Sequence, residues 1–188
     1  MRVTTVGSGD AFGSGGRFQT CIALAAHSAD APSVLLDCGA TSLTALHQQQ
    51  IDPNQIEAVL VTHLHGDHFG GLPFLVLDGQ FRRRTHDLTV FGPPGTRTRL
   101  EQAMEILFPG SSGVQRRFAV HVVEYADRRT LVLGPLRVTA YEVCPALPRG
   151  VVPWGRSGRG GQGVVAVAQR SSQAGAQGQS VGRCKRSR

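Results

Sequence analysis

Long apolar runs and paired cysteines are missing from these 188 residues. No stretch approaches the roughly 18 apolar residues that a membrane-spanning helix needs, and residues 1–10 contain no apolar core of a signal peptide. We therefore expect a protein that is neither exported nor inserted into a membrane. The four cysteines form no Cys-x-x-Cys pair; they are Cys21, Cys38, Cys144 and Cys184. This usage predicts reduced thiols and a cytoplasmic location rather than a disulfide framework or a cysteine-rich zinc site.

Negative charge is missing from the end of the chain, and this explains the net charge of +7. Residues 1–144 hold 12 arginines against 13 acidic residues, which leaves a balance of −1. Residues 145–188 hold seven arginines and one lysine without an acidic residue, a balance of +8. The basic character therefore belongs to the last 44 residues and not to the body of the protein.

Residues 144–188 also differ in kind, because they are rich in glycine and arginine. Stretches such as residues 155–163 have no hydrophobic period and too little apolar surface to offset the entropy of ordering. We expect a disordered tail that contains at most one short strand, at residues 164–168. A solvated tail is the first interpretation, and RNA binding and a shifted reading frame are the alternatives.

Residues 1–143 show the pattern of a mixed α/β domain. Alternating and continuous apolar segments predict strands at residues 2–6, 21–25, 33–37, 58–62, 88–91, 118–125 and 136–143. Helical spacing predicts helices at residues 41–50, 71–77 and 98–108. This order predicts stacked α/β layers.

The glycine-rich turn at residues 7–16 follows the first strand and invites comparison with a dinucleotide-binding loop. Its third glycine comes one residue late for the Gly-x-Gly-x-x-Gly pattern, and Asp10 would present a carboxylate to the pyrophosphate. We interpret the segment as a tight turn that borders a polar site.

Three histidines and one aspartate fall within six residues, directly after the strand at residues 58–62. The four residues are His63, His65, Asp67 and His68. Imidazole nitrogens and carboxylate oxygens are ligands that zinc accepts. In extended backbone His63 and His65 point to the same side, and Gly66 permits a sharp turn that brings the other two beside them. The pattern predicts a metal site rather than a polar loop with coincidental histidines.

Residues 62–73 resemble the His-x-His-x-Asp-His signature of the metallo-β-lactamase fold superfamily, in a form closer to its ribonuclease Z and arylsulfatase-like branches. Residues 35–39 resemble the strand-Asp-x-Gly element of that family, and residues 7–10 resemble its first turn. The resemblance covers residues 1–143 and implies an αββα sandwich. Its site would lie at one edge of two packed sheets.

The resemblance implies a zinc-dependent hydrolase whose substrate is RNA, another phosphodiester or a small-molecule ester. His63 and His65 would bind a first Zn²⁺, Asp67 and His68 would bind a second, and Asp67 would also be the catalytic proton acceptor. Two such ions lower the pKa of a bridging water and clamp the attacked oxygen.

The further ligands of the family have no evident counterpart. A third histidine is expected after the strand at residues 136–143, and a bridging aspartate and a final histidine should follow. No histidine follows His121 and no acidic residue follows Glu142. Cys144 is a candidate replacement for the third histidine. We interpret His27, His47, His86 and His121 as surface or core residues, and the arginine run at residues 82–84 as a solvated face that in a ribonuclease contacts phosphates.

The missing ligands and the change of composition coincide near residue 144, and a frameshift in a family member would explain both. Three functions stay open: a metal-dependent hydrolase, a non-enzymatic fragment of one, and a nucleic-acid-binding module that uses the basic tail. An incomplete sandwich would leave apolar sheet faces uncovered, so we also expect association, for example as a homo-oligomer.

Overall fold

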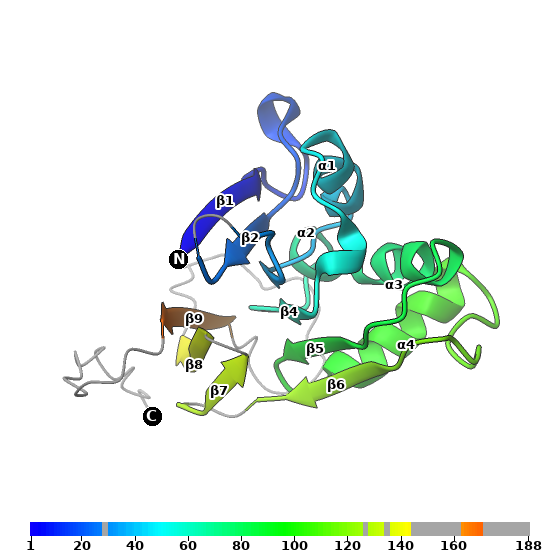
Figure 1. Cartoon of the computed structure of the whole chain (residues 1–188). Coiled ribbons are helices and arrows are strands. Elements are labelled where there is room, and N and C mark those ends of the chain that lie inside the picture. The colour runs from blue at the N-terminus through cyan, green and yellow to red at the C-terminus, as the bar shows by residue number, and fades with distance from the viewer. Residues whose placement is uncertain (28–29, 126–127, 134–135, 144–162, 171–188) are drawn as a thin grey trace, which may run out of the picture.

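Two β-sheets and a set of helices make up the computed structural model (Figure 1), which describes residues 1–27, 30–125, 128–133, 136–143 and 163–170. The larger sheet has the strand order β1 to β6. Its strands are β1 (Arg2–Gly7), β2 (Cys21–Ala25), β3 (Val34–Leu36), β4 (Ala58–Leu60), β5 (Leu88–Gly92) and β6 (Val120–Glu124). β1 to β3 pair as antiparallel neighbours, whereas β3 to β6 run parallel.

Helices cover one face of this sheet. They are α1 (Ser42–Gln48), α2 (Gly66–Phe69), α3 (Leu72–Phe81) and α4 (Thr96–Leu107), with 3-10 turns η1 (Ser14–Gly16) and η2 (Pro53–Gln55). Leu46, Leu75 and Leu100 of the three longer helices share a buried cluster with Val59 and Val90 of the sheet. Because residues three and four apart lie on one helix face, this apolar spacing fixes which side of each helix is buried.

The smaller sheet covers the opposite face. It consists of three antiparallel strands, β7 (Thr130–Leu133), β8 (Leu136–Val143) and β9 (Gly163–Arg170). Leu131, Leu136 and Val138 of this sheet are buried in one cluster with Leu60 and Phe91 of the larger sheet. The described residues thus form a helix layer and two packed sheets, three layers of the expected αββα sandwich, and they confirm that fold class.

The expected strands and helices are confirmed in position, with two informative differences. The predicted helix at residues 71–77 continues to Phe81 and includes Gly79. Gly79 packs closely there, since a Cβ would lie 3.1 Å from the Arg84 side chain and 3.2 Å from that of Phe118. The short strand expected at residues 164–168 is present as β9. It extends beyond the expected bounds, from Gly163 to Arg170. The rest of 144–188, Cys144 included, lies outside the described residues.

None of the helices in the described part of the chain has the length and hydropathy that crossing a bilayer requires. For the site, the decisive feature is the pair β3 and β4. Parallel neighbours end at the same edge of a sheet, and in open α/β sheets that edge is where ligands bind. Asp37 follows β3, and residues 61–65 follow β4.

Candidate metal centre

The predicted site residues come together beyond the carboxyl end of β4. The ring centroids of His63 and His65 lie 4.7 Å apart, and those of His63 and His68 lie 4.0 Å apart. Asp67 joins them through Oδ2, which is 3.3 Å from Nε2 of His68. The structure thus brings the four residues near one another, and we call them the His/Asp cluster. That they bind metal stays a prediction.

A single turn of helix, rather than a glycine turn, brings the second pair beside the first. The carbonyl of His65 accepts hydrogen bonds from the backbone N–H groups of His68 (3.0 Å) and Phe69 (2.9 Å). Gly66 begins this helix, α2, and is not among the residues with positive φ in the described part of the chain. The chain therefore turns at Gly66, as expected, but the turn does not require glycine, since a Cβ at this position would meet nothing within 4 Å.

Asp37 orients one histidine of the cluster directly. Its side chain is buried, and its φ of 61° is unusual for a residue other than glycine, although aspartate tolerates it better than most. Oδ2 of Asp37 lies 2.7 Å from Nδ1 of His68. With the proton on Nδ1, the lone pair of His68 is on Nε2, the nitrogen nearest Asp67.

Thr62 extends the same arrangement to a second histidine. Its backbone N–H donates to Oδ1 of Asp37 at 2.7 Å, and its hydroxyl lies 3.0 Å from both carboxylate oxygens. The same hydroxyl lies 3.0 Å from Nδ1 of His63. If the hydroxyl donates to Asp37 and accepts from His63, then His63 also keeps its lone pair on Nε2. One buried carboxylate thus contacts His68 directly and His63 through Thr62, the usual place of an outer partner in a metal site.

Glycines hold the loops after β3 and α2 against each other. The N–H of Cys38 donates to the carbonyl of His68 at 2.7 Å, and the N–H of Gly71 donates to the carbonyl of Cys38 at 2.8 Å. A Cβ on Gly39 would lie 2.3 Å from the carbonyl oxygen of Asp67, and one on Gly71 would lie 2.2 Å from that of Gly39. Only glycine permits this approach, so the position of the His/Asp cluster depends on it.

The surroundings shift the pKa values of His63 and His68 in opposite directions. Burial, with smaller contributions from His68 and His65, lowers the pKa of His63, which is therefore neutral at pH 7. Burial also acts to lower the pKa of His68. The hydrogen bond to Asp37 and the charges of Asp37 and Asp67 outweigh it and raise that pKa above its usual value. The two carboxylates thus favour the protonated form of His68.

The imidazole nitrogens and carboxylate oxygens of the His/Asp cluster are suitable ligand atoms for a divalent metal ion, and one pair of them also has a suitable spacing. Two ligands of a tetrahedral zinc ion, each at about 2.0–2.2 Å, are separated by roughly 3.3–3.6 Å. The 3.3 Å between Nε2 of His68 and Oδ2 of Asp67 agrees with that separation. Across the described residues, no three His, Cys, Asp or Glu side chains are grouped closely enough to hold one ion. This part of the chain therefore offers two donors to an ion, and further ligands would have to complete each sphere.

The other histidines lie apart from the cluster, as expected. His47 is 3.8 Å from Asp78, and Nε2 of His121 is 3.0 Å from Oδ2 of Asp87, with both histidine side chains about half exposed. His86 contributes its backbone carbonyl to a hydrogen bond with Arg84, and the backbone N–H of His27 donates to Asp30.

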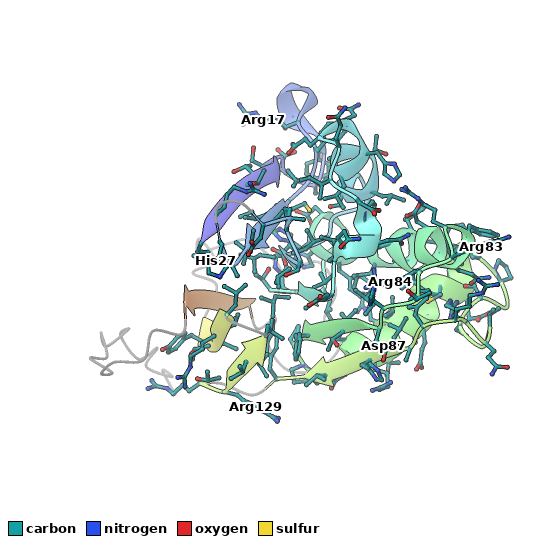
Figure 2. The ribbon with its side chains drawn as sticks, in the orientation of Figure 1. Arg17, His27, Arg83, Arg84, Asp87 and Arg129 are labelled. Atoms are coloured by element: carbon teal, nitrogen blue, oxygen red, sulfur yellow. The ribbon has the colours of Figure 1, made fainter. Side chains whose placement is uncertain are left out.

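The arginine run is not a uniform solvated face. Arg84 is only 3% exposed, and burial lowers its pKa (Figure 2). Its guanidinium donates to the carbonyls of Pro53, Ile56, His86 and Asp87. The interpretation as a solvated face is therefore wrong for Arg84, which ties η2 to β5 and is not available to a phosphate.

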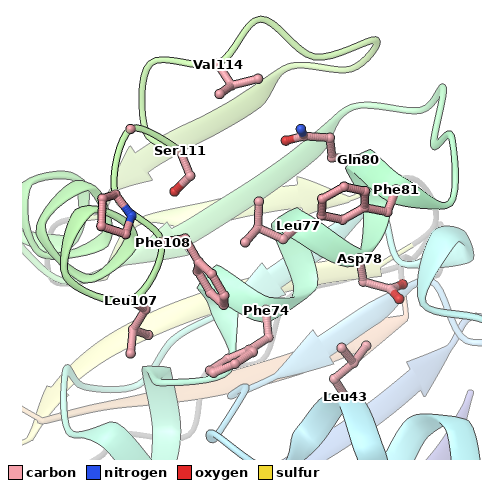
Figure 3. A pocket seen from close by; sticks show the side chains of 12 residues that line it. Leu43, Phe74, Leu77, Asp78, Gln80, Phe81, Leu107, Phe108, Ser111 and Val114 are labelled. Atoms are coloured by element: carbon pink, nitrogen blue, oxygen red, sulfur yellow. The ribbon is translucent and has the colours of Figure 1, made fainter.

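An apolar groove of about 620 Å³ lies between α3 and the segment that follows α4 (Figure 3). Phe74 and Phe108 meet edge to face in its wall, with ring centroids 5.3 Å apart. Asp78 is the only titratable residue in its lining, and none of the His/Asp cluster contributes to it. The chemistry of the candidate site therefore lies elsewhere.

Comparison with known proteins shows the family of this chain. Residues 1–130 match the family model described as Anti-Pycsar protein Apyc1. The chain belongs to this family. Ribonuclease BN from Erwinia tasmaniensis is 31% identical over 141 residues, which cover 75% of this chain and 45% of that protein. The chain thus spans less than half the length of this curated relative.

Solved structures confirm the fold. Human tRNase Z, short form, superposes with a TM-score of 0.61 and 26% identity, over 76% of this chain and 60% of that one. The metallo-β-lactamase fold protein YhfI from Bacillus subtilis superposes with a TM-score of 0.59 and 18% identity, over 89% and 56%. The resemblance to the metallo-β-lactamase superfamily is therefore confirmed. The relatives include proteins named as ribonucleases, among them ribonuclease Z from Bacillus cereus, which is 32% identical over 131 residues, 70% of this chain and 41% of that protein.

Two residues of the site were missed from the sequence. Asp37 appeared only as part of a resembling segment, and Thr62 only as the start of the signature. One sequence signal pointed to Asp37: it is a polar residue directly after a buried apolar strand. His63 follows another such strand by three residues. What the sequence did not show is that these two strands are parallel neighbours.

Proposed function

We propose that this chain is a metal-dependent hydrolase of phosphodiester bonds, with RNA or a related phosphodiester as substrate. The observation that carries the proposal is that the buried Asp37 contacts Nδ1 of His68 directly and Nδ1 of His63 through the Thr62 hydroxyl. Both histidines then have Nε2 available as the metal-binding nitrogen, which is the usual result of such an outer carboxylate. Relatives named as ribonucleases support the phosphodiester class over other esters.

Each residue has a defined part in this proposal. His63 and His65 hold one Zn²⁺, and Asp67 and His68 hold a second. Bound ions of this kind supply charge that polarises the phosphoryl group and lowers the pKa of a water molecule. Asp67 accepts the proton of the attacking water, and Asp37 keeps the proton of His68 on Nδ1. We further propose a cytoplasmic protein in which Cys144 or a second copy of the chain completes the ligand set.

The test is hydrolysis of bis(p-nitrophenyl) phosphate and of a short RNA by the purified chain with Zn²⁺. Activity that disappears with a chelator and in Asp67→Asn, but persists in His121→Ala, supports the proposal. His121 is a matched control because it is also paired with an aspartate but lies outside the His/Asp cluster. Absence of turnover in the zinc-loaded wild-type chain overturns the proposal and favours the non-enzymatic fragment.

A second candidate, nucleic-acid binding through residues 145–188, rests on their charge balance of +8. Its affinity for RNA should fall steeply as salt is raised and should survive chelation, whereas hydrolysis should not. Removal of residues 171–188, which contain four of the eight basic side chains, should weaken such binding without affecting metal content.

A further inference from the structure

The turn between β1 and β2 displays an aromatic ring to solvent. We call residues 8–19 the glycine loop. Phe12 in this loop is 93% exposed, more than any other large apolar side chain of the described residues. A phenylalanine that contacts almost nothing adds little to the fold, since burial is what makes such a ring stabilising. The position of Phe12 therefore calls for a role outside the core.

The loop holds this ring on a fixed backbone. Oδ1 of Asp10 accepts hydrogen bonds from the N–H groups of Phe12 and Ser14, each at 3.0 Å. The side-chain amide of Gln19 donates to the carbonyl of Ala11 at 3.1 Å. Three glycines nearby adopt positive φ; they are Gly13, Gly15 and Gly16. A ring presented in this way costs little entropy to immobilise when a ligand binds.

The loop also borders the His/Asp cluster. The Cβ of Gln19 and the carbonyl oxygen of Asp67 both crowd the same face of Gly39, at 2.6 Å and 2.3 Å from where its Cβ would stand. The backbone N–H of Gln19 donates to Thr41 at 2.8 Å. Gln19 therefore packs on Gly39 on the side where the backbone of Asp67 also lies, and its side-chain amide reaches Ala11, the residue before Phe12.

The glycine loop that carries Phe12 also carries a positively charged side chain. Arg17 is exposed on the same loop (Figure 2), and its guanidinium makes no hydrogen bond or ion pair with the described residues. Asp10 is the nearest acidic residue in the loop, and its carboxylate is already engaged by loop amides. An exposed ring and a free guanidinium on one rigid loop match the two parts of a nucleotide, the base and the phosphate.

We propose that the glycine loop binds a nucleotide of the substrate beside the phosphodiester to be cleaved, with Phe12 stacked on the base and Arg17 paired with its phosphate. The inference rests on the proposed function, because it takes the His/Asp cluster as the place of cleavage. It differs from the dinucleotide-binding pattern excluded from the sequence, since side chains and not glycine amides make the contacts. Phe12 and Arg17 are then determinants of substrate specificity.

The test is equilibrium binding of tetra-adenylate by calorimetry, with the full chain and without turnover. The comparison probe is an abasic tetranucleotide of the same length, which has the phosphates and no bases. Phe12→Ala and Phe12→Leu should weaken tetra-adenylate binding about 5- to 100-fold and leave abasic binding unchanged, because stacking needs an aromatic face. Phe12→Trp should retain binding. Arg17→Gln should weaken both probes and reduce the salt dependence by about one phosphate contact.

Phe81→Ala is the matched control, because Phe81 is 78% exposed but lies at the end of α3 in the groove lining. Binding unchanged in Phe12→Ala, an equal loss for both probes, or no binding of tetra-adenylate to the wild-type chain overturns the inference. Tetra-adenylate that binds through Phe12 but is not cleaved in zinc sustains the inference and counts against the proposed function. The two failures are therefore distinguishable.

Discussion

At the scale of single residues, the site depends most on a side chain that need not touch a metal. Asp37 is buried, holds a left-handed backbone conformation and receives hydrogen bonds from two segments of the loop after β4. A buried carboxylate without partners would be costly, so its surroundings are built to satisfy it. The same contacts that satisfy Asp37 also orient His63 and His68.

Asp37→Asn should lower zinc affinity about 10- to 100-fold, because the amide can no longer accept a hydrogen bond at both positions and the tautomers of the histidines are released. The measurement is competition for Zn²⁺ against a chromophoric chelator at pH 7. Asp10→Asn is a suitable comparison, since Asp10 is an exposed carboxylate that also accepts backbone hydrogen bonds. Equal affinities of wild type and Asp37→Asn would rule out the positioning role.

For Asp78 and Asp87 we predict opposite contributions to the pH dependence of folding stability. Burial raises the pKa of Asp78 above its usual value, although Arg82 and His47 oppose it, and its Oδ2 has no hydrogen-bond partner. The folded state therefore disfavours the Asp78 carboxylate. The hydrogen bond from the N–H of Ala119, with that to His121, lowers the pKa of Asp87, so the folded state favours the Asp87 carboxylate.

Asp78→Asn should raise the free energy of unfolding at pH 7 by about 1 kcal/mol, the lower end of the cost of an unsatisfied buried polar group. The gain should vanish near pH 3, where both folded and unfolded chains carry a protonated Asp78. Asp87→Asn should lower stability at pH 7, and this loss should be smaller at pH 3, toward the lowered pKa of Asp87. Urea unfolding at the two pH values measures both, and a gain for Asp78→Asn that persists at pH 3 would refute the electrostatic cause.

At the scale of elements, the position of the His/Asp cluster depends on two segments that pack against each other. These are the loop after β3 and the junction between α2 and α3. Sequence patterns identified most elements here because each has a local signal, such as the apolar run before His63. Arg84 shows where that approach ends. Its burial depends on η2, 28 to 31 residues away, and no pattern within the arginine run distinguishes Arg84 from its neighbours.

The same limit applies to Asp37, whose role follows from the parallel pairing of β3 with β4. The metal-ligand pattern at residues 63–68 is local and could be read directly. The partners that orient those ligands come from a different strand, and only the folded arrangement shows which ones they are. The αββα architecture itself was accessible through resemblance and not through periodicity.

Gly39→Ala should destabilise the chain by about 1–3 kcal/mol and weaken zinc binding, because the new methyl group would collide with the carbonyl of Asp67. Gly66→Ala is the matched control in the same region. It meets open space and should leave stability unchanged or raise it by up to about 1 kcal/mol. Urea unfolding and zinc titration of the two variants make the comparison. Similar behaviour of the two would show that the interlocked glycines do not position the cluster.

At the scale of the whole molecule, the described residues form one helix layer and two sheets, with the His/Asp cluster at the edge where β3 and β4 end. β9 pairs with β8 along its full length, so residues 163–170 belong to the fold despite the glycine-rich composition around them. Val132 on β7 is 68% exposed, which is consistent with a sheet that has one covered face. Association through such surfaces stays a prediction.

The most direct test of the central claim is the metal content of the purified chain, measured by plasma mass spectrometry after equilibration with Zn²⁺ and removal of free metal. We predict two Zn²⁺ per wild-type chain and the same content in His121→Ala. The triple variant His63→Ala/His65→Ala/Asp67→Asn should lose the bound zinc. Wild-type chain without zinc, or equal zinc in the wild type and in the variant of the His/Asp cluster, would contradict the account.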